Sequence, residues 1–193
     1  MSLRLVLVRH GLSSFNEKGL IQGRTDDSYL TEKGYAQALK SGEALSNINF
    51  ERIYSSPLVR AAETAKTIQR NLQNECNIIY DKNLLEVDLS SWSGLSMNEI
   101  KTKHPKKYVI WKNDPENLEL ERDNNFTYQP IQELYDQANL FIENIFKNYS
   151  GQGQVNILIV GHNAILRCLV LSLIGRPKQG FRKIKLDLSL IHI

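Results

Sequence analysis

The chain has 193 residues, of which 41% are hydrophobic and 23% are charged, and its formal net charge is +3. This length can bury one sizeable core but is short for two, so we expect a single domain over residues 1–193. The ordinary composition excludes a disordered protein. Basic and acidic side chains are nearly equal in number. Nucleic-acid-binding domains concentrate Lys and Arg on one face, so we expect no nucleic-acid partner.

The sequence also argues against a secreted or membrane protein. The first apolar run, residues 5–8, is far shorter than the apolar core of an export signal. The most apolar later stretch, residues 164–174, contains an arginine and is about half as long as a bilayer span. Cys76 and Cys168 lack the number and spacing of a disulfide framework or a zinc site, so we expect buried, reduced thiols. A cytoplasmic protein without membrane contact is therefore expected.

Four short apolar runs have the pattern of buried strands, because they lack the alternation of a half-exposed strand. They cover residues 3–8, 52–54, 77–80 and 156–160. Helical patterns lie between them, and Thr31 is the expected N-cap of the first helix. The apolar face of this helix would comprise Tyr35, Ala38, Leu39, Gly42 and Leu45.

The next helix should begin at Ser56-Pro57, with the serine as N-cap and the proline in the first turn. Its apolar stripe would comprise Leu58, Ala61, Ala62, Ala65 and Ile68. Another helix is expected to begin near Asn163, directly after the fourth strand. Strands that alternate with helices predict an α/β fold, here a three-layer, open, mostly parallel sheet with helices on both faces.

Two segments depart from this alternation. The pattern is weak between residues 92 and 128, and we interpret this segment as a small inserted cap. Apolar and polar residues alternate over 184–190, which predicts a half-exposed edge strand. Because the chain ends close to this strand, it is either complete or one domain of a longer protein.

The first motif that can carry chemistry is LVLVRHG, residues 5–11. The end of the strand would deliver Arg9 and His10 to the edge at which open α/β sheets bind ligands. Arg9 can clamp a phosphate, and His10 can attack one if an acceptor holds its other ring nitrogen. Gly11 would allow the backbone to approach closely there. Taken alone, the tripeptide is more simply explained as a chance sequence at a strand end.

Two further motifs could complete an anion site. In NILIVGHNAILR, residues 156–167, His162 would lie where free N–H groups and the helix dipole favour an anion. A histidine that only caps this turn is the alternative. In SSPLVRAAETA, residues 55–65, Arg60 lies early in a helix, where a cation opposes the dipole and a bound phosphate would compensate it. An exposed arginine that covers apolar neighbours is the alternative.

Together the motifs resemble the histidine phosphatase superfamily, also called phosphoglycerate-mutase-like. The resemblance rests on RHG, Asn16, Gln22-Gly23, LTEKG, SSPLxRAxxTA, LLEVDLSSWSG and GHN, in order along nearly the whole chain. It implies an open α/β sheet with an inserted cap and with His10 as the nucleophile that becomes phosphohistidine. The implied catalytic residues are His10, Arg9, Arg60, His162 and Glu86, and the implied substrate-binding residues are Asn16, Gln22, Gly23 and Asn163.

The chemistry that this resemblance implies needs no metal and no cofactor. The arginines and a protonated His162 would stabilise the charge on the equatorial phosphate oxygens. Glu86 would protonate the leaving oxygen, and we expect the arriving phosphate dianion to favour protonation of this carboxyl group. Asp88 is the rival acid, because it lies on the same side if this stretch is extended.

The opening RHGLSSFNEKGLIQG and the segment WKNDPEN are more similar to the plant and cyanobacterial 2-carboxyarabinitol-1-phosphate phosphatase branch than to the mutases. This implies a small sugar phosphate or phosphorylated sugar acid as substrate. Leu12, Ser90 and Asn163 depart from the family pattern without removing a catalytic group. Mutase-type phosphoryl transfer and a non-catalytic domain that binds a phosphorylated ligand are the alternatives. A homodimer is also compatible with the sequence.

The remaining histidines and the tryptophans are expected to be structural. His104 and His192 have no neighbouring motif. Trp92 and Trp111 could wall the pocket, but large aromatic side chains more often fill a core. The five lysines between residues 101 and 112 are expected to form a solvated face.

Overall fold

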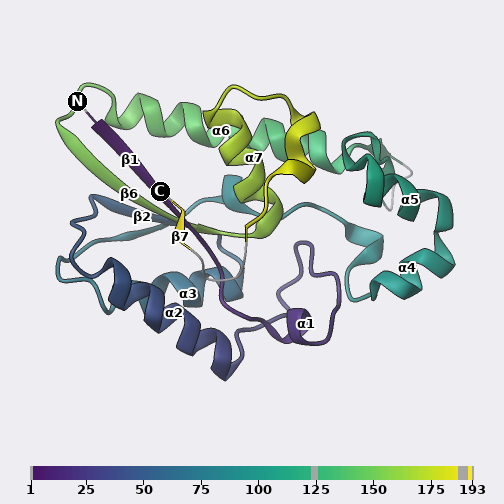
Figure 1. Ribbon diagram of the computed structural model, residues 1–193, viewed down its shortest axis with the longest axis horizontal. Coiled ribbons are helices and arrows are strands. Elements are labelled where there is room, and N and C mark those ends of the chain that lie inside the picture. Colours follow the sequence, from purple (N-terminus) through teal and green to yellow (C-terminus); the bar gives the residue numbers. More distant parts are fainter. Residues whose placement is uncertain (1, 123–125, 187–190, 193) are drawn as a thin grey trace.

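The computed structural model describes residues 2–122, 126–186 and 191–192 (Figure 1). Its strands are β1 (Ser2–Arg9), β2 (Arg52–Ser55), β3 (Ile78–Tyr80), β4 (Leu120–Glu121), β5 (Thr127–Tyr128), β6 (Gln154–Gly161) and β7 (Ile191–His192). Its α-helices are α1 (Ser14–Glu17), α2 (Glu32–Leu45), α3 (Val59–Gln69), α4 (Met97–Lys103), α5 (Pro105–Asn113), α6 (Pro130–Tyr149) and α7 (Asn163–Leu173). Its 3-10 helices are η1 (Lys82–Leu84), η2 (Ser90–Trp92), η3 (Pro115–Asn117) and η4 (Lys178–Lys183).

The central sheet has the strand order β3-β2-β6-β1-β7, and of these strands β7 runs antiparallel to its neighbour. β1 and β6 pair in parallel along their whole length, from Ser2 opposite Gln154 to Arg9 opposite Gly161. β2 pairs in parallel with both β6 and β3. The predicted open, mostly parallel sheet is therefore confirmed, and the carboxyl ends of β1, β2 and β6 lie at one edge.

Helices cover both faces of this sheet, with α2 and α3 on one side and α6 and α7 on the other (Figure 1). Successive side chains of a strand point to opposite faces, so a strand that is covered twice must be apolar throughout. Val6 and Val8 accordingly pack in the core beneath α2 and α3, whereas Leu7 packs in the core with α6 and α7. The three-layer α/β class expected from the unbroken apolar runs is confirmed.

Helix α2 begins where the sequence predicts. The Thr31 side chain accepts a hydrogen bond from the backbone N–H of Gly34 at 3.1 Å. Its buried face is only partly as expected, because Tyr35 and Leu39 are each 42% exposed. A Cβ on Gly42 would lie 3.2 Å from the backbone of Ile68, so α3 packs closely against α2 there.

Helix α3 begins later than predicted, and Ser56 is not its N-cap. The helix starts at Val59, whose backbone N–H donates to the Asp26 carboxylate at 2.8 Å. The Ser56 hydroxyl instead lies 2.8 Å from a ring nitrogen of His162. The Ser56 hydroxyl also accepts the N–H of Leu58 at 3.3 Å, so it stabilises the turn before the helix and not the first turn of the helix itself. The predicted apolar stripe of α3 is buried as expected.

The segment 92–128 forms α4, α5, η3 and the small β4-β5 sheet at one end of the molecule (Figure 1). Trp92 is fully buried, and its ring centroid lies 6.4 Å from that of His104. Four of the five lysines in this segment are exposed, as predicted. The edge strand predicted over 184–190 is not formed over 184–186, and residues 187–190 lie outside the described residues. The observed edge strand is β7, which pairs with Leu7 and Val8 of β1.

Two further expectations concern the whole described chain. Cys76 and Cys168 are buried and free, as predicted, and burial raises the pKa of both thiols. Within the described residues, no helix combines the length and the apolar character that a membrane span requires.

Candidate active site

The candidate site lies at the carboxyl ends of three neighbouring strands. His10, Ser56 and His162 directly follow β1, β2 and β6. The backbone N–H of His10 donates to the carbonyl of Gly161 at 3.0 Å, which extends the pairing of β1 with β6. The ring centroids of His10 and His162 are 5.1 Å apart. The sheet register thus brings the RHG and GHN motifs together, as the sequence predicts.

His10 has the tautomer and the charge state of a nucleophile. Its Nδ1 lies 2.7 Å from the carbonyl oxygen of Gly11, and because a carbonyl can only accept, Nδ1 carries the proton. The Nε2 atom therefore keeps its lone pair. Burial, together with the positive charges of Arg60 and Arg9, holds the pKa of His10 well below its usual value. The ring is neutral at neutral pH, as nucleophilic attack requires.

His162 is fully buried, and in the absence of a bound anion its surroundings disfavour the protonated form. Burial, Arg60, His10 and Arg9 together hold the pKa of His162 well below its usual value. Its Nε2 lies 2.8 Å from the Ser56 hydroxyl, and Nδ1 has no hydrogen-bond partner among the described residues. Sequence reasoning missed Ser56 as a site residue, although its place two residues after a predicted strand was a usable signal.

Arg60 is completely buried, which rules out the alternative of an exposed arginine. Its guanidinium donates to the carbonyl oxygens of Gly23 and Thr25, each at 2.8 Å. Burial lowers the pKa of Arg60 to about 10, against the opposing effect of Glu86 and Asp26, so the group remains charged. Gly23 has a φ of +52°, a left-handed conformation that favours glycine, and this turn presents its carbonyl to the guanidinium.

Gly11 allows a close backbone approach, as expected, and its backbone neighbour is Gly34. A Cβ at this position would lie 2.4 Å from the carbonyl oxygen of Gly34 in the first turn of α2. The Gly11 N–H donates to the Thr64 hydroxyl at 3.1 Å. The close backbone approach at Gly11 therefore docks the loop against α2 and α3.

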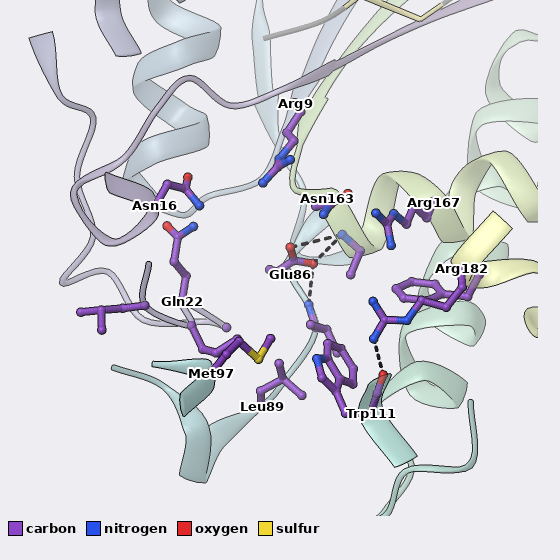
Figure 2. Close-up of a pocket in the computed structure, with 16 residues that line it drawn as sticks. Arg9, Asn16, Gln22, Glu86, Leu89, Met97, Trp111, Asn163, Arg167 and Arg182 are labelled. Carbon is purple, nitrogen blue, oxygen red and sulfur yellow. Dashed lines mark hydrogen bonds between the residues drawn. The ribbon is translucent and has the colours of Figure 1, made fainter. Parts of the chain in front are cut away.

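A pocket of about 230 Å³ opens beside these residues (Figure 2). The predicted residues that line it are Arg9, Asn16, Gln22, Gly23, Glu86 and Asn163. His10, Arg60 and His162 are not among its lining residues and lie buried next to it. The described residues contain no group of three or more His, Cys, Asp or Glu side chains that could hold a metal ion.

Further lining residues were not predicted as site residues, and they include Met97, Trp111, Arg167, Phe181 and Arg182. Met97 and Trp111 come from the segment interpreted as a cap, so this segment forms part of the pocket wall. Trp111 therefore combines the two roles considered for it, since it is 8% exposed and also packs against Trp92. Arg167 follows Asn163 by four residues on α7, a helical spacing that places both on one face and could have revealed it.

Glu86 lines the pocket at the N-terminus of α7. Its carboxylate accepts the backbone N–H groups of Ala164 at 3.2 Å and Ile165 at 3.3 Å. The free N–H groups that we expected to hold a bound anion are thus already engaged by a protein carboxylate. The rival acid Asp88 accepts the N–H of Ser90 and lies 3.4 Å from Arg122, outside the pocket lining. The geometry therefore favours Glu86.

Asn16 and Gln22 lie together on one wall of the pocket (Figure 2). The Ser13 hydroxyl lies 2.9 Å from the side-chain oxygen of Asn16 and 2.8 Å from that of Gln22. The Ser28 hydroxyl also donates to the Gln22 oxygen at 2.8 Å. Because the amide oxygens are held by hydroxyl groups, the amide NH₂ groups are the ones left to donate to a ligand.

Comparison with known proteins shows the family of this chain. The sequence matches the model of the histidine phosphatase superfamily (branch 1) over residues 5–193. The chain therefore belongs to this superfamily, as the sequence motifs predict.

Three individual proteins illustrate what the chain is similar to within this superfamily. A 2-carboxy-D-arabinitol-1-phosphatase of Triticum aestivum is 35% identical over 179 residues, which are 93% of this chain and 34% of that protein. Phosphoserine phosphatase 1 of Hydrogenobacter thermophilus is 29% identical over 196 residues, or 99% of this chain and 87% of that protein. The solved structure of Bacillus stearothermophilus YhfR superimposes with a TM-score of 0.86 at 25% identity. The alignment covers 98% of this chain and 89% of the YhfR chain.

These relatives confirm the expected similarity to the plant phosphatase branch. The chain spans about a third of the length of the plant relatives that it matches. Phosphoglycerate mutases are also among the proteins similar to it.

Proposed function

We propose that this protein hydrolyses a small phosphate monoester through a phosphohistidine intermediate on His10, without a metal or cofactor. The observation that carries the proposal is the state of His10, whose Nδ1 donates to the Gly11 carbonyl at 2.7 Å. This hydrogen bond leaves the Nε2 lone pair available. A non-catalytic ligand-binding domain would have no need of a neutral, oriented imidazole among buried arginines.

The reaction proceeds in two displacements. The Nε2 lone pair of His10 attacks phosphorus, the bond from phosphorus to the ester oxygen breaks, and the leaving alkoxide takes the proton of Glu86. Water then attacks the phosphohistidine and gives one proton to the Glu86 carboxylate. The nitrogen–phosphorus bond breaks, inorganic phosphate leaves, and His10 returns to its neutral form.

The surrounding groups stabilise the charge that moves during these steps. Arg9 and Arg60 contribute fixed positive charge to the equatorial oxygens. A bound phosphate dianion would supply the negative charge that favours protonation of His162, whose unpaired Nδ1 could then donate to it. Asn16, Gln22, Gly23 and Asn163 hold the substrate at the mouth of the pocket.

Hydrolysis is favoured over mutase-type transfer. A mutase must keep its phosphohistidine away from water until a second hydroxyl group accepts the phosphoryl group. The pocket wall here includes the exposed side chain of Arg182, so water can reach the rim. The names of the plant relatives favour a phosphorylated sugar acid as substrate. Mutase activity remains the second candidate, because mutases are among the relatives.

The nucleophile is tested by His10→Ala, with p-nitrophenyl phosphate as substrate in buffer that contains EDTA. We expect the wild-type protein to release phosphate with EDTA present, and His10→Ala to lower kcat about 10³-fold or more. Rapid acid quenching of the wild-type reaction with ³²P-labelled substrate should trap an acid-labile phosphoprotein that His10→Ala lacks.

His104→Ala is the matched control, because His104 packs against Trp92 outside the pocket lining. Undiminished turnover by His10→Ala would remove His10 from the mechanism. Transfer of the phosphoryl group to an added phosphoglycerate, in place of phosphate release, would establish the mutase alternative.

A cytoplasmic location, the absence of a nucleic-acid partner and the alternative of a homodimer stay predictions. We also propose that residues 92–128 form a cap on a single domain. It is supported by Met97 and Trp111, which this segment contributes to the pocket wall.

A further inference from the structure

Two arginines line the pocket and have no part in the proposed chemistry. Arg167 comes from α7 and Arg182 from η4. Figure 2 shows them on the wall opposite Asn16 and Gln22, with Glu86 between the two walls. Arg182 lies on the other side of Glu86 from Arg9 (Figure 2). The pocket therefore has a second cationic end, away from the residues expected to bind the transferred phosphate.

The two guanidinium groups are held in place without a carboxylate partner. Within the described residues, neither forms a salt bridge. Arg167 lies over the ring of Phe181 at 5.3 Å, and Arg182 lies over Trp111 at 5.0 Å. Arg182 also donates to the backbone carbonyl of Trp111. Aromatic faces and a carbonyl thus fix both side chains and leave most of their donors unused.

This arrangement has an electrostatic cost that an anion would relieve. Burial and the charge of Arg167 lower the pKa of Arg182, and burial lowers that of Arg167. The carboxylates that oppose these effects are Glu86 for Arg167 and Glu116 for Arg182. In the proposed mechanism Glu86 is protonated when substrate binds, so Arg167 loses that counter-charge during the reaction. Of the two carboxylates, only Glu116 then keeps its negative charge opposite the two guanidinium groups.

We propose that Arg167 and Arg182 form a subsite for a second anionic group of the substrate, a carboxylate or a second phosphate. This inference rests on the proposed function and narrows it to phosphate monoesters that carry another oxyanion. Guanidinium offers paired donors that match both groups. A pocket of about 230 Å³ suits a small metabolite whose two anionic groups lie at its opposite ends.

The subsite is tested with pairs of substrates that differ only in the second anion. Two pairs remove a carboxylate, namely 3-phosphoglycerate against glycerol 3-phosphate and 6-phosphogluconate against sorbitol 6-phosphate. One pair removes a phosphate, namely ribulose 1,5-bisphosphate against ribulose 5-phosphate. We expect the wild-type protein to prefer the doubly anionic member of at least one pair by about 10-fold or more in kcat/KM. The pair that shows the preference identifies the second group as carboxylate or phosphate.

The variants are Arg182→Ala and Arg167→Gln, of which the second keeps part of the side-chain stem against Phe181. Each should raise KM for the preferred substrate about 10- to 100-fold, while kcat for p-nitrophenyl phosphate, which has no second anion, stays near the wild-type value. Arg70→Ala is the matched control, because Arg70 is exposed and lies outside the pocket lining.

The outcomes separate the two proposals. Loss of the preference in either pocket variant, with p-nitrophenyl phosphate hydrolysis retained as evidence of folding, supports the subsite. No preference in any pair, or a preference that survives in both variants, overturns the subsite and leaves the proposed phosphatase intact. Absence of turnover on every phosphoester in the wild-type protein would instead contradict the proposed function itself.

Discussion

Glu86 shows how one residue can be tied to the backbone and still face a substrate. Its carboxylate accepts the N–H groups of Ala164 and Ile165, which hold the side chain at the N-terminus of α7. The Nε of Arg24 donates to the backbone carbonyl of Glu86 at 2.9 Å and holds the chain from the other side. The acid is therefore positioned before substrate arrives, so little conformational freedom is lost in the reaction.

Replacing Glu86 by Gln should slow hydrolysis by an amount that depends on whether the leaving group needs a proton. The amide oxygen can still accept the α7 N–H groups, but the side chain no longer supplies a proton to the leaving oxygen. We expect kcat for alkyl phosphates such as glycerol 3-phosphate to fall about 10²- to 10⁴-fold. Hydrolysis of p-nitrophenyl phosphate should fall far less, because p-nitrophenolate leaves without protonation. Equal losses of kcat on both substrates would show that Glu86 is not the acid. Asp88→Asn is the control, and we expect it to have little effect on either substrate.

At the scale of elements, helix α2 fixes the loop that carries the nucleophile. Its N-cap residue Thr31 donates through both its backbone N–H and its hydroxyl to the carbonyl of Leu12, at 3.0 and 3.1 Å. The Leu12 N–H donates to the side chain of Gln37 at 2.8 Å. With Gly11 packed against Gly34, these contacts make the first turn of α2 a support for His10. A helix cap thus contributes to the site without touching the pocket.

Thr31→Ala should lower the free energy of unfolding by about 1 kcal/mol, within the range of roughly 0.5–2 kcal/mol known for N-caps. The lost interactions are the acceptor for the Gly34 N–H and the donor to Leu12. Urea unfolding followed by circular dichroism measures the change. Thr31→Ser keeps the hydroxyl and should stay close to the wild type; a serine variant as unstable as the alanine variant would show that the cap hydrogen bonds contribute nothing.

The whole molecule places two neutral histidines among buried arginines, and its stability should therefore depend on pH. In the unfolded chain both histidines bind a proton below about pH 6.5. In the folded chain burial and the arginines hold the pKa of His10 and of His162 well below that value. The unfolded state then binds more protons, so the free energy of unfolding falls as the pH drops below about 6.5.

The expected loss is up to about 1.4 kcal/mol per pH unit for each histidine, and it continues until the pH reaches the folded-state pKa. Urea unfolding between about pH 7 and pH 5.5 measures it. A His10→Gln/His162→Gln double variant should show a shallower slope over this range. The same slope in the wild type and the double variant would contradict the neutral state of both rings.

Much of the fold could be predicted because it depends on local patterns. Runs such as residues 3–8 are apolar at every position, which only a strand covered on both faces tolerates. Thr31 could be identified as a cap because capping is satisfied within one turn. The start of α3 could not be predicted, because it depends on Asp26 and His162, which are distant in sequence from Ser56.

The sequence by itself determined the sheet, the placement of His10 and His162 at strand ends, and the family to which the chain belongs. Those properties follow from periodicity and short motifs. Only the tertiary structure decided the lowered pKa of His162, the engagement of the α7 N–H groups by Glu86, and the second cationic end formed by Arg167 and Arg182. The physical reason is that burial and charge at a site are sums over neighbours from distant segments, which no local pattern contains.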